Sequence, residues 1–197
     1  NGAFRHFDLN NDIIYLSNIK FMLAKPTGSC GGSILAEGTT QLNINNCVFE
    51  YNEAYRGGAI CVKDEGTKMI IKDSTFSDND ATKEGGGTYV NNKGSIDVQN
   101  CNINNNDSDE SGGGIYSSDS GTTVTIKDSS IDQNFGRYGA GGLMVSNYAY
   151  ASVTNTDFDG NTAHGGNRGR AFRVQHYGQV VMDGCTFSND PYVLWLS

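Results

Sequence analysis

A repeat of 27 to 29 residues runs through the chain of 197 residues and constrains its fold more than any other feature. The repeat is anchored by an apolar residue that is followed three positions later by Asn. This pair recurs as Phe49 with Asn52, Phe76 with Asn79, Ile103 with Asn106, Ile131 with Asn134, and Phe158 with Asn161. With Phe21 and Phe187 included, the anchors are separated by 28, 27, 27, 28, 27 and 29 residues. So regular a period predicts a solenoid in which each repeat packs on the next.

A second marker, two glycines followed by a small residue and usually an aliphatic one, accompanies the first. It appears as GGSI from Gly31, GGAI from Gly57, GGGT from Gly85 and GGGI from Gly112, with degenerate copies from Ala140 and Gly169. Between the markers apolar and polar residues alternate, as at Met69 and Ile71. Alternation with period two between Gly and Asn turns predicts about three short strands in each repeat.

Short strands that repeat in register can bury their apolar faces only by stacking coil on coil. We therefore predict an all-β, right-handed parallel β-helix of the pectin-lyase-like type, with about seven coils roughly 4.8 Å apart. The expected coils of this single domain are residues 1–30, 31–56, 57–84, 85–111, 112–139, 140–168 and 169–197. The repeated asparagines should form a structural ladder of stacked amides through Asn52, Asn79, Asn106, Asn134 and Asn161.

The sequence FEYN from Phe49 together with GGAI from Gly57 resembles the polymorphic membrane protein repeats of chlamydial autotransporters. The hallmark of those repeats is GGA followed by Ile, Leu or Val, combined with FxxN. The resemblance extends over nearly the whole chain, and similar β-helix repeats occur in surface proteins of other bacteria and of protists. It implies a passenger domain of an adhesin, with a binding role at a cell surface.

Charge and cysteine content set further expectations. A formal net charge of -8 without a basic stripe predicts no nucleic-acid binding, and no apolar run approaches the roughly 20 residues of a membrane helix. Cys47 and Cys101 share a column two coils apart, while Cys61 occupies an outward strand position and Cys30 precedes the glycines. We therefore expect no disulfide. We expect Cys47, Cys101 and Cys185 to be small core residues rather than metal ligands or nucleophiles.

One candidate binding surface is an outward lane of residues on consecutive coils. The lane comprises Leu35, Cys61, Tyr89, Tyr116 and Met144. Exposed apolar stripes usually mark contact surfaces, and Tyr148 and Tyr150, with Tyr138, lie in longer turns that could extend this one. The other interpretation is that a loop covers the lane, in which case these tyrosines need no ligand.

Polar side chains offer weaker candidates. Asp132, Asp157 and Asp159 share one outer face, where solvation of an acidic chain is favoured over a weak Ca²⁺ site or a catalytic carboxylate pair. Asn106 begins a glycosylation sequon with Asp107 and Ser108, but its place in the ladder favours a structural role. The three histidines show no metal-ligand spacing, and no cofactor is expected.

These observations favour a non-enzymatic structural or adhesive module of a repetitive surface or fibre protein. Because the first and last repeats look like uncapped interior coils, we expect a segment of a longer solenoid, or ends that dock on neighbouring subunits. The partner would be protein or glycan at a cell surface, or further subunits in lateral or end-to-end assembly. Two alternatives remain open: a carbohydrate-active lyase or hydrolase, and an intracellular ciliary or cytoskeletal scaffold, which unpaired thiols would favour.

Overall fold

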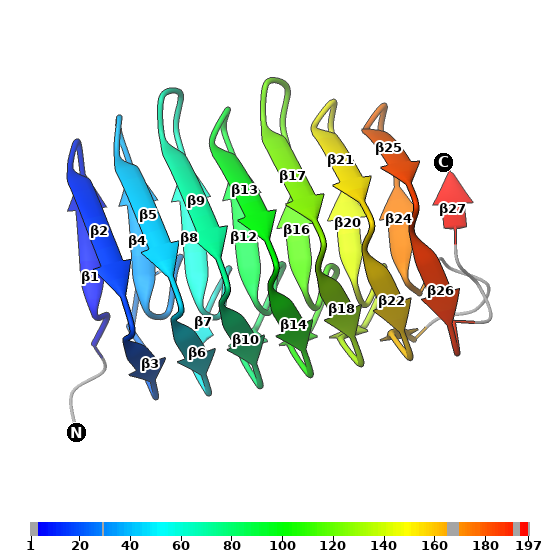
Figure 1. Cartoon of the computed structure of the whole chain (residues 1–197), viewed down its shortest axis with the longest axis horizontal. Coiled ribbons are helices and arrows are strands. Elements are labelled where there is room, and N and C mark those ends of the chain that lie inside the picture. The colour runs from blue at the N-terminus through cyan, green and yellow to red at the C-terminus, as the bar shows by residue number, and fades with distance from the viewer. Residues whose placement is uncertain (1–3, 29, 165–169, 191–193, 197) are drawn as a thin grey trace.

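The computed structural model describes residues 4–28, 30–164, 170–190 and 194–196. It is a right-handed parallel β-helix of about seven coils, and all the strand pairs it describes are parallel (Figure 1). The described residues contain no helix. Each interior coil contributes one strand to each of four sheets, one more than the three strands that the alternation predicts.

The sheets are numbered in the order in which a coil visits them. Sheet 1 contains β1 (Phe7–Asn10), β4 (Ile34–Glu37), β8 (Ile60–Lys63), β12 (Thr88–Asn91), β16 (Ile115–Ser117), β20 (Leu143–Val145), β24 (Phe172–Val174) and β27 (Leu194–Leu196). Sheet 2 contains β2 (Ile13–Ser17), β5 (Gln41–Asn45), β9 (Lys68–Lys72), β13 (Ser95–Gln99), β17 (Thr123–Lys127), β21 (Tyr150–Thr154) and β25 (Gln179–Asp183). Sheet 3 contains β3 (Lys20–Met22), β6 (Val48–Glu50), β10 (Thr75–Ser77), β14 (Asn102–Asn104), β18 (Ser130–Asp132), β22 (Asp157–Asp159) and β26 (Thr186–Ser188). Sheet 4 contains the two-residue strands β7 (Glu53–Ala54), β11 (Asp80–Ala81), β15 (Asp107–Ser108), β19 (Phe135–Gly136) and β23 (Thr162–Ala163).

The anchor residues stack on one another along the axis of the solenoid. Phe76 pairs with Phe49 on one side and with Ile103 on the other, all three being buried. The ring centroid of Phe49 lies 4.8 Å from that of Phe21 and 4.7 Å from that of Phe76, and the ring planes are nearly parallel. The period of the sequence is therefore the rise of one coil, which places like residues in direct contact in the core.

The repeated asparagines form a continuous inner ladder, which comprises Asn52, Asn79, Asn106, Asn134 and Asn161. Each is fully or almost fully buried. The backbone N–H and the side-chain Nδ2 of Asn79 both donate to Oδ1 of Asn106, at 3.1 and 2.8 Å. Nδ2 of Asn79 also donates to the carbonyl of Phe49 at 3.0 Å. Each amide thus satisfies backbone groups that the bend would otherwise leave without partners.

A second column of polar residues lies on the outside, at the bend between sheets 2 and 3. This bend column comprises Asn46, Asp73, Asn100, Asp128 and Asn155, all in the left-handed conformation with φ between 46° and 52°. Asn and Asp tolerate this conformation better than other residues with a β-carbon, because their short polar side chains bond locally. The bend therefore explains the residue type, and all five side chains are exposed.

The prediction that the chain has no disulfide is wrong. Cys30 and Cys61 are bonded, with their Cα atoms 5.6 Å apart. Cys61 lies on the outward face of β8. Cys30, just before Gly31, lies across that face and pairs with Arg56 through an isolated parallel β-bridge of the backbone. The sequence register compared each cysteine only with its own column, whereas this bond joins two columns. Cys47, Cys101 and Cys185 are free.

Candidate functional site

The predicted outward lane is not an exposed surface. Tyr89 and Tyr116 are only 7% and 8% exposed, and Met144 is fully buried. With Leu35, Cys61, Cys30 and Ala140 they form a second apolar cluster outside sheet 1. The interpretation that a covering segment shields the lane is therefore the one observed, and the exposed-stripe interpretation is wrong.

The segments that precede the paired glycines form this cover. The Arg56 guanidinium lies over the ring of Tyr89, 5.4 Å from its centroid, and Nε of Arg56 donates to Glu84 at 2.5 Å. The rings of Tyr89 and Tyr116 stack with centroids 5.5 Å apart. Burial raises the pKa of both phenols, so they are neutral at physiological pH. These tyrosines stabilise the cover and present no face to a ligand.

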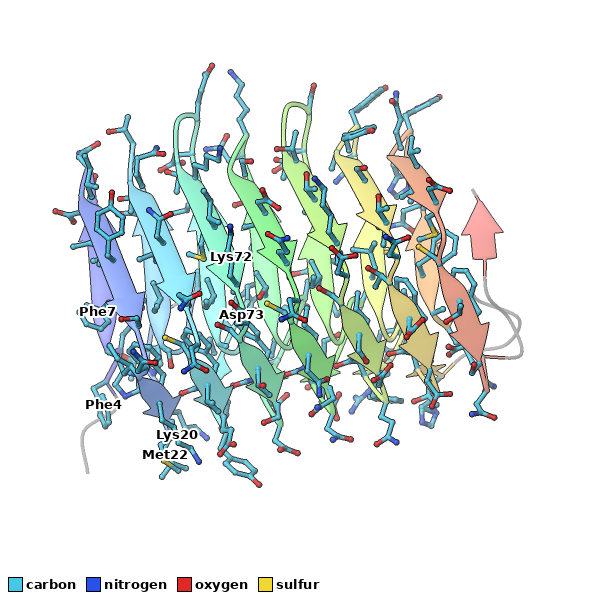
Figure 2. The ribbon with its side chains drawn as sticks, viewed as in Figure 1. Phe4, Phe7, Lys20, Met22, Lys72 and Asp73 are labelled. Carbon is cyan, nitrogen blue, oxygen red and sulfur yellow. A yellow bond between two sulfur atoms is a disulfide. The ribbon has the colours of Figure 1, made fainter. Side chains whose placement is uncertain are left out.

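A polar groove of about 600 Å³ lies instead over the bend between sheets 2 and 3. It follows the solenoid axis across four consecutive coils, and Figure 2 labels Asp73 at this bend. Its outer lining consists of two side chains from each coil, one from the bend column and one from the start of the next strand. These are Asp73 with Thr75, Asn100 with Asn102, Asp128 with Ser130, and Asn155 with Asp157.

Amide and carboxylate groups alternate along the bend column. Nδ2 of Asn100 donates to Oδ1 of Asp73 at 2.5 Å, and Nδ2 of Asn155 donates to Oδ1 of Asp128 at 3.2 Å. Each of these hydrogen bonds uses one polar atom of an exposed side chain that has several. The remaining oxygens and N–H groups face the groove and can bond a ligand.

The base of the groove is closed by the small residues Ser74, Cys101 and Ser129. The hydroxyls of Ser74 and Ser129 donate to the backbone carbonyls two residues earlier, at 2.6 and 2.7 Å. The Cys101 thiol likewise donates to the carbonyl of Gln99 at 3.2 Å. Burial raises the pKa of Cys101 to about 11, so it is a protonated thiol rather than a nucleophile at neutral pH.

The structure places the three predicted aspartates at two different positions. Asp157 lines the groove, whereas Asp132 and Asp159 lie in register on β18 and β22, outside its lining. Burial, with a smaller contribution from Asp159, raises the pKa of Asp132, although a hydrogen bond from the Ser130 hydroxyl opposes the shift. Asn189 donates to Asp159 at 2.7 Å. Among the described residues no three His, Cys, Asp or Glu side chains are placed to hold a metal ion.

The remaining predicted residues lie elsewhere. Asn106 is fully buried, and its Nδ2 donates to the carbonyl of Phe76 and to Oδ1 of Asn134, so the sequon nitrogen is already used. Tyr148 and Tyr150 lie at the opposite end of sheet 2 from the groove, beside the turn that leads into β21. The structure therefore does not bring them together with the carboxylates.

Sequence reasoning missed the groove and the partner of Tyr148. The bend column repeats at the same period as the anchors, but repeated Asn and Asp are typical of turns and do not by themselves indicate a groove. Tyr177 follows Tyr148 by 29 residues, and the two rings stack with centroids 5.0 Å apart. Their separation equals the length of one repeat, and this was the signal that could have revealed the pair.

Comparison with known proteins assigns the family. Residues 7–158 match the family described as the right-handed beta helix region. Because this match covers well over half of the chain, the protein belongs to that family. Searches of curated proteins and of solved structures give no match. The described residues include no helix that could cross a membrane.

Proposed function

We propose that this chain is a non-catalytic, glycan-binding module of a surface or fibre protein, and that the groove at the bend between sheets 2 and 3 is its binding face. The observation that carries the proposal is the regular lining of the groove. Each of four consecutive coils supplies one side chain from the bend column and one from the following strand. A polymer whose units repeat at the same distance would meet equivalent hydrogen-bonding groups at each coil.

The spacing supports an extended polysaccharide as this polymer. Adjacent coils of a parallel β-helix are about 4.8 Å apart, so four coils present a groove of roughly 15 Å between the first and last strands. A pyranose in an extended, equatorially linked chain advances by a similar distance. One sugar residue would therefore lie over each coil, with its hydroxyls bonded to the alternating amides and carboxylates.

The charge of the groove selects among glycans. Its lining contains the carboxylates of Asp73, Asp128 and Asp157 and no Lys or Arg. An anionic polymer such as a uronate would be repelled from this face. The preferred ligand is therefore a neutral or amino-sugar polysaccharide, which carboxylates and amides can bind through its hydroxyl groups.

A second candidate function is glycoside hydrolysis at Asp132 and Asp159. The raised pKa of Asp132 suits a general acid, and the in-register strands place the backbones of Asp132 and Asp159 about 5 Å apart, on adjacent coils. Binding is preferred because Asp132 and Asp159 both lie outside the groove lining.

The disulfide supports placement at a cell surface. Cys30 and Cys61 are bonded, and such bonds persist mainly in oxidising compartments. Cys47 and Cys101 are buried, so their free thiols are compatible with an oxidising environment. The ciliary or cytoskeletal alternative draws less support from this arrangement.

The proposal is tested by measuring the affinity of the chain for cellohexaose, mannohexaose and chitohexaose, with hexagalacturonate as the anionic comparison. We expect binding of at least one neutral hexamer and none of hexagalacturonate. Asp157→Ala should weaken binding about tenfold, the value of one or two lost hydrogen bonds. Asp159→Ala, on the same strand but outside the groove, is the matched control and should bind normally.

The same variants distinguish the enzymatic alternative. If the chain releases reducing ends from these hexamers and Asp159→Ala abolishes the release, the hydrolase function is correct and the binding function is wrong. If no hexamer binds, or if both variants bind equally well, the groove is not the glycan site.

A further inference from the structure

We propose that Tyr148 and Tyr177 form a second, independent glycan-binding site, which stacks on the face of a single pyranose ring. The two tyrosines lie on the turns that lead into β21 and β25, at the upper ends of these strands in Figure 1. These turns are at the opposite end of sheet 2 from the groove. The site therefore does not depend on the groove or on its proposed function.

The two rings form an exposed aromatic stack. Their centroids are 5.0 Å apart and their planes differ by 15°. Tyr148 is 58% exposed and Tyr177 is 75% exposed. The face of an aromatic ring is electron-rich, and the axial C–H groups on one face of a pyranose are slightly positive, so the two pack well together.

The backbone of both turns is strained to hold these side chains. Ala149 N donates to the carbonyl of Ser146 at 3.0 Å, and the turn into β25 closes in the same way. The two central residues of each turn have positive φ: 50° at Asn147 and 64° at Tyr148, then 47° at His176 and 62° at Tyr177. Gly is strongly favoured at the second position of such a turn, and a bulky side chain there lowers stability.

Because both rings are exposed, burial of apolar surface does not offset this strain. Two successive coils carry the same unfavourable choice, and the resulting rings meet in one stack. The turn at Asn92 and Lys93 has the same pair of positive φ values, 50° and 69°, so the stacking of the two rings, and not the strain, distinguishes this surface.

The size of the site favours a sugar over a protein. The exposed apolar surface here is small, since Tyr150 and Val181 are the only other large apolar residues of β21 and β25 that are exposed, whereas a stable protein interface buries about 800 Å² on each partner. Asn147 and His176 are exposed beside the rings, and Gln175 follows β24 at the base of the turn. These side chains can bond the hydroxyls at the rim of a sugar ring whose face lies on a tyrosine.

The test is saturation-transfer NMR with the methyl glycosides of glucose, galactose and mannose, recorded on the intact chain. We expect saturation transfer to the ring protons of at least one glycoside. In the double variant Tyr148→Asn, Tyr177→Asn the transfer should fall to background. Asn accepts positive φ, so the thermal midpoint of the double variant should stay unchanged or rise.

Tyr51→Asn is the matched control, because Tyr51 is also exposed (55%) and left-handed, with φ of 53°. It should leave the saturation transfer unchanged. The proposal is overturned if no glycoside shows transfer, if the double variant retains it, or if Tyr51→Asn removes it equally. Failure of the groove experiment would leave these outcomes unaffected.

Discussion

Two columns of Asn and Asp run along the solenoid, one inside and one outside, and they obey different rules. In the inner ladder Asn106 both donates and accepts, and its amide is fully buried. In the bend column Asn100 makes one side-chain bond, to Asp73, and is exposed. The inner ladder therefore needs an amide at each level, whereas the bend column accepts Asp as readily as Asn. The inner polar groups are used by the fold, and the outer ones are available to a ligand.

The largest expected effect comes from making one substitution in both columns. Asn106→Asp replaces a buried donor with an oxygen facing the carbonyl of Phe76, while Asn100→Asp removes one exposed hydrogen bond to Asp73 and leaves two solvated carboxylates side by side. We expect Asn106→Asp to lower the free energy of unfolding by about 3 kcal/mol, and Asn100→Asp by less than about 0.5 kcal/mol. Urea unfolding at pH 7 measures both. Equal losses would remove the distinction between the columns.

Reduction of the disulfide tests the cover that hides the outward lane. The Cys30–Cys61 bond closes a loop with a sequence separation of 31 residues. Replacing both cysteines with serine should lower the free energy of unfolding by about 2 kcal/mol, because the unfolded chain regains conformational freedom. Hydrogen exchange should become faster in the amides of 30–36 and 56–62. No change in either measurement would mean that the bond is absent or plays no structural part.

The fold could be predicted from sequence because Phe49, Phe76 and Asn79 repeat at the period of the coil. The cover over sheet 1 could not, since the segments before the glycines vary in length and sequence. Tyr89, Tyr116 and the Cys30–Cys61 pair were misjudged for this one reason. The groove was missed because left-handed bends explain Asp73 and Asn100 fully as turn residues. Their exposure on one side of the solenoid depends on its curvature, which no local pattern records.

The last coil is an exception to the need for an amide at each level of the inner ladder. Asp190 stands three residues after Phe187, at the ladder position, and is buried. Burial raises the pKa of Asp190 to about 6, although hydrogen bonds from Asn161 oppose the shift. Because the unfolded chain releases this proton first, stability should fall as pH rises from about 4 to about 6 and then stay level. Asp190→Asn should remove that component and add on the order of 1 kcal/mol at pH 7. Thermal unfolding between pH 4 and pH 8 measures this, and parallel curves for the two proteins would contradict it.

The smallest effect is expected on the outer face of sheet 4. Asp80 pairs with Glu53 and Asp107, and burial followed by repulsion from these carboxylates raises its pKa to about 6. Asp80→Asn should stabilise the chain above pH 6 by less than about 1 kcal/mol, since the side chain is only partly buried and solvent screens its charge. Carbon-detected NMR titration of the Asp80 carboxyl measures the pKa directly. A value near 4 would show that the neighbouring carboxylates do not interact with it.

The most direct test of the account is the side-chain amide NMR spectrum during titration with cellohexaose, mannohexaose and chitohexaose. If the groove binds glycan, the amide signals of Asn100, Asn102 and Asn155 should shift with at least one of them. The signals of Asn79, Asn106 and Asn134 should stay in place in the same spectra. No shift with any hexamer, or equal shifts in the bend column and the inner ladder, would contradict the assignment of the groove as the binding face.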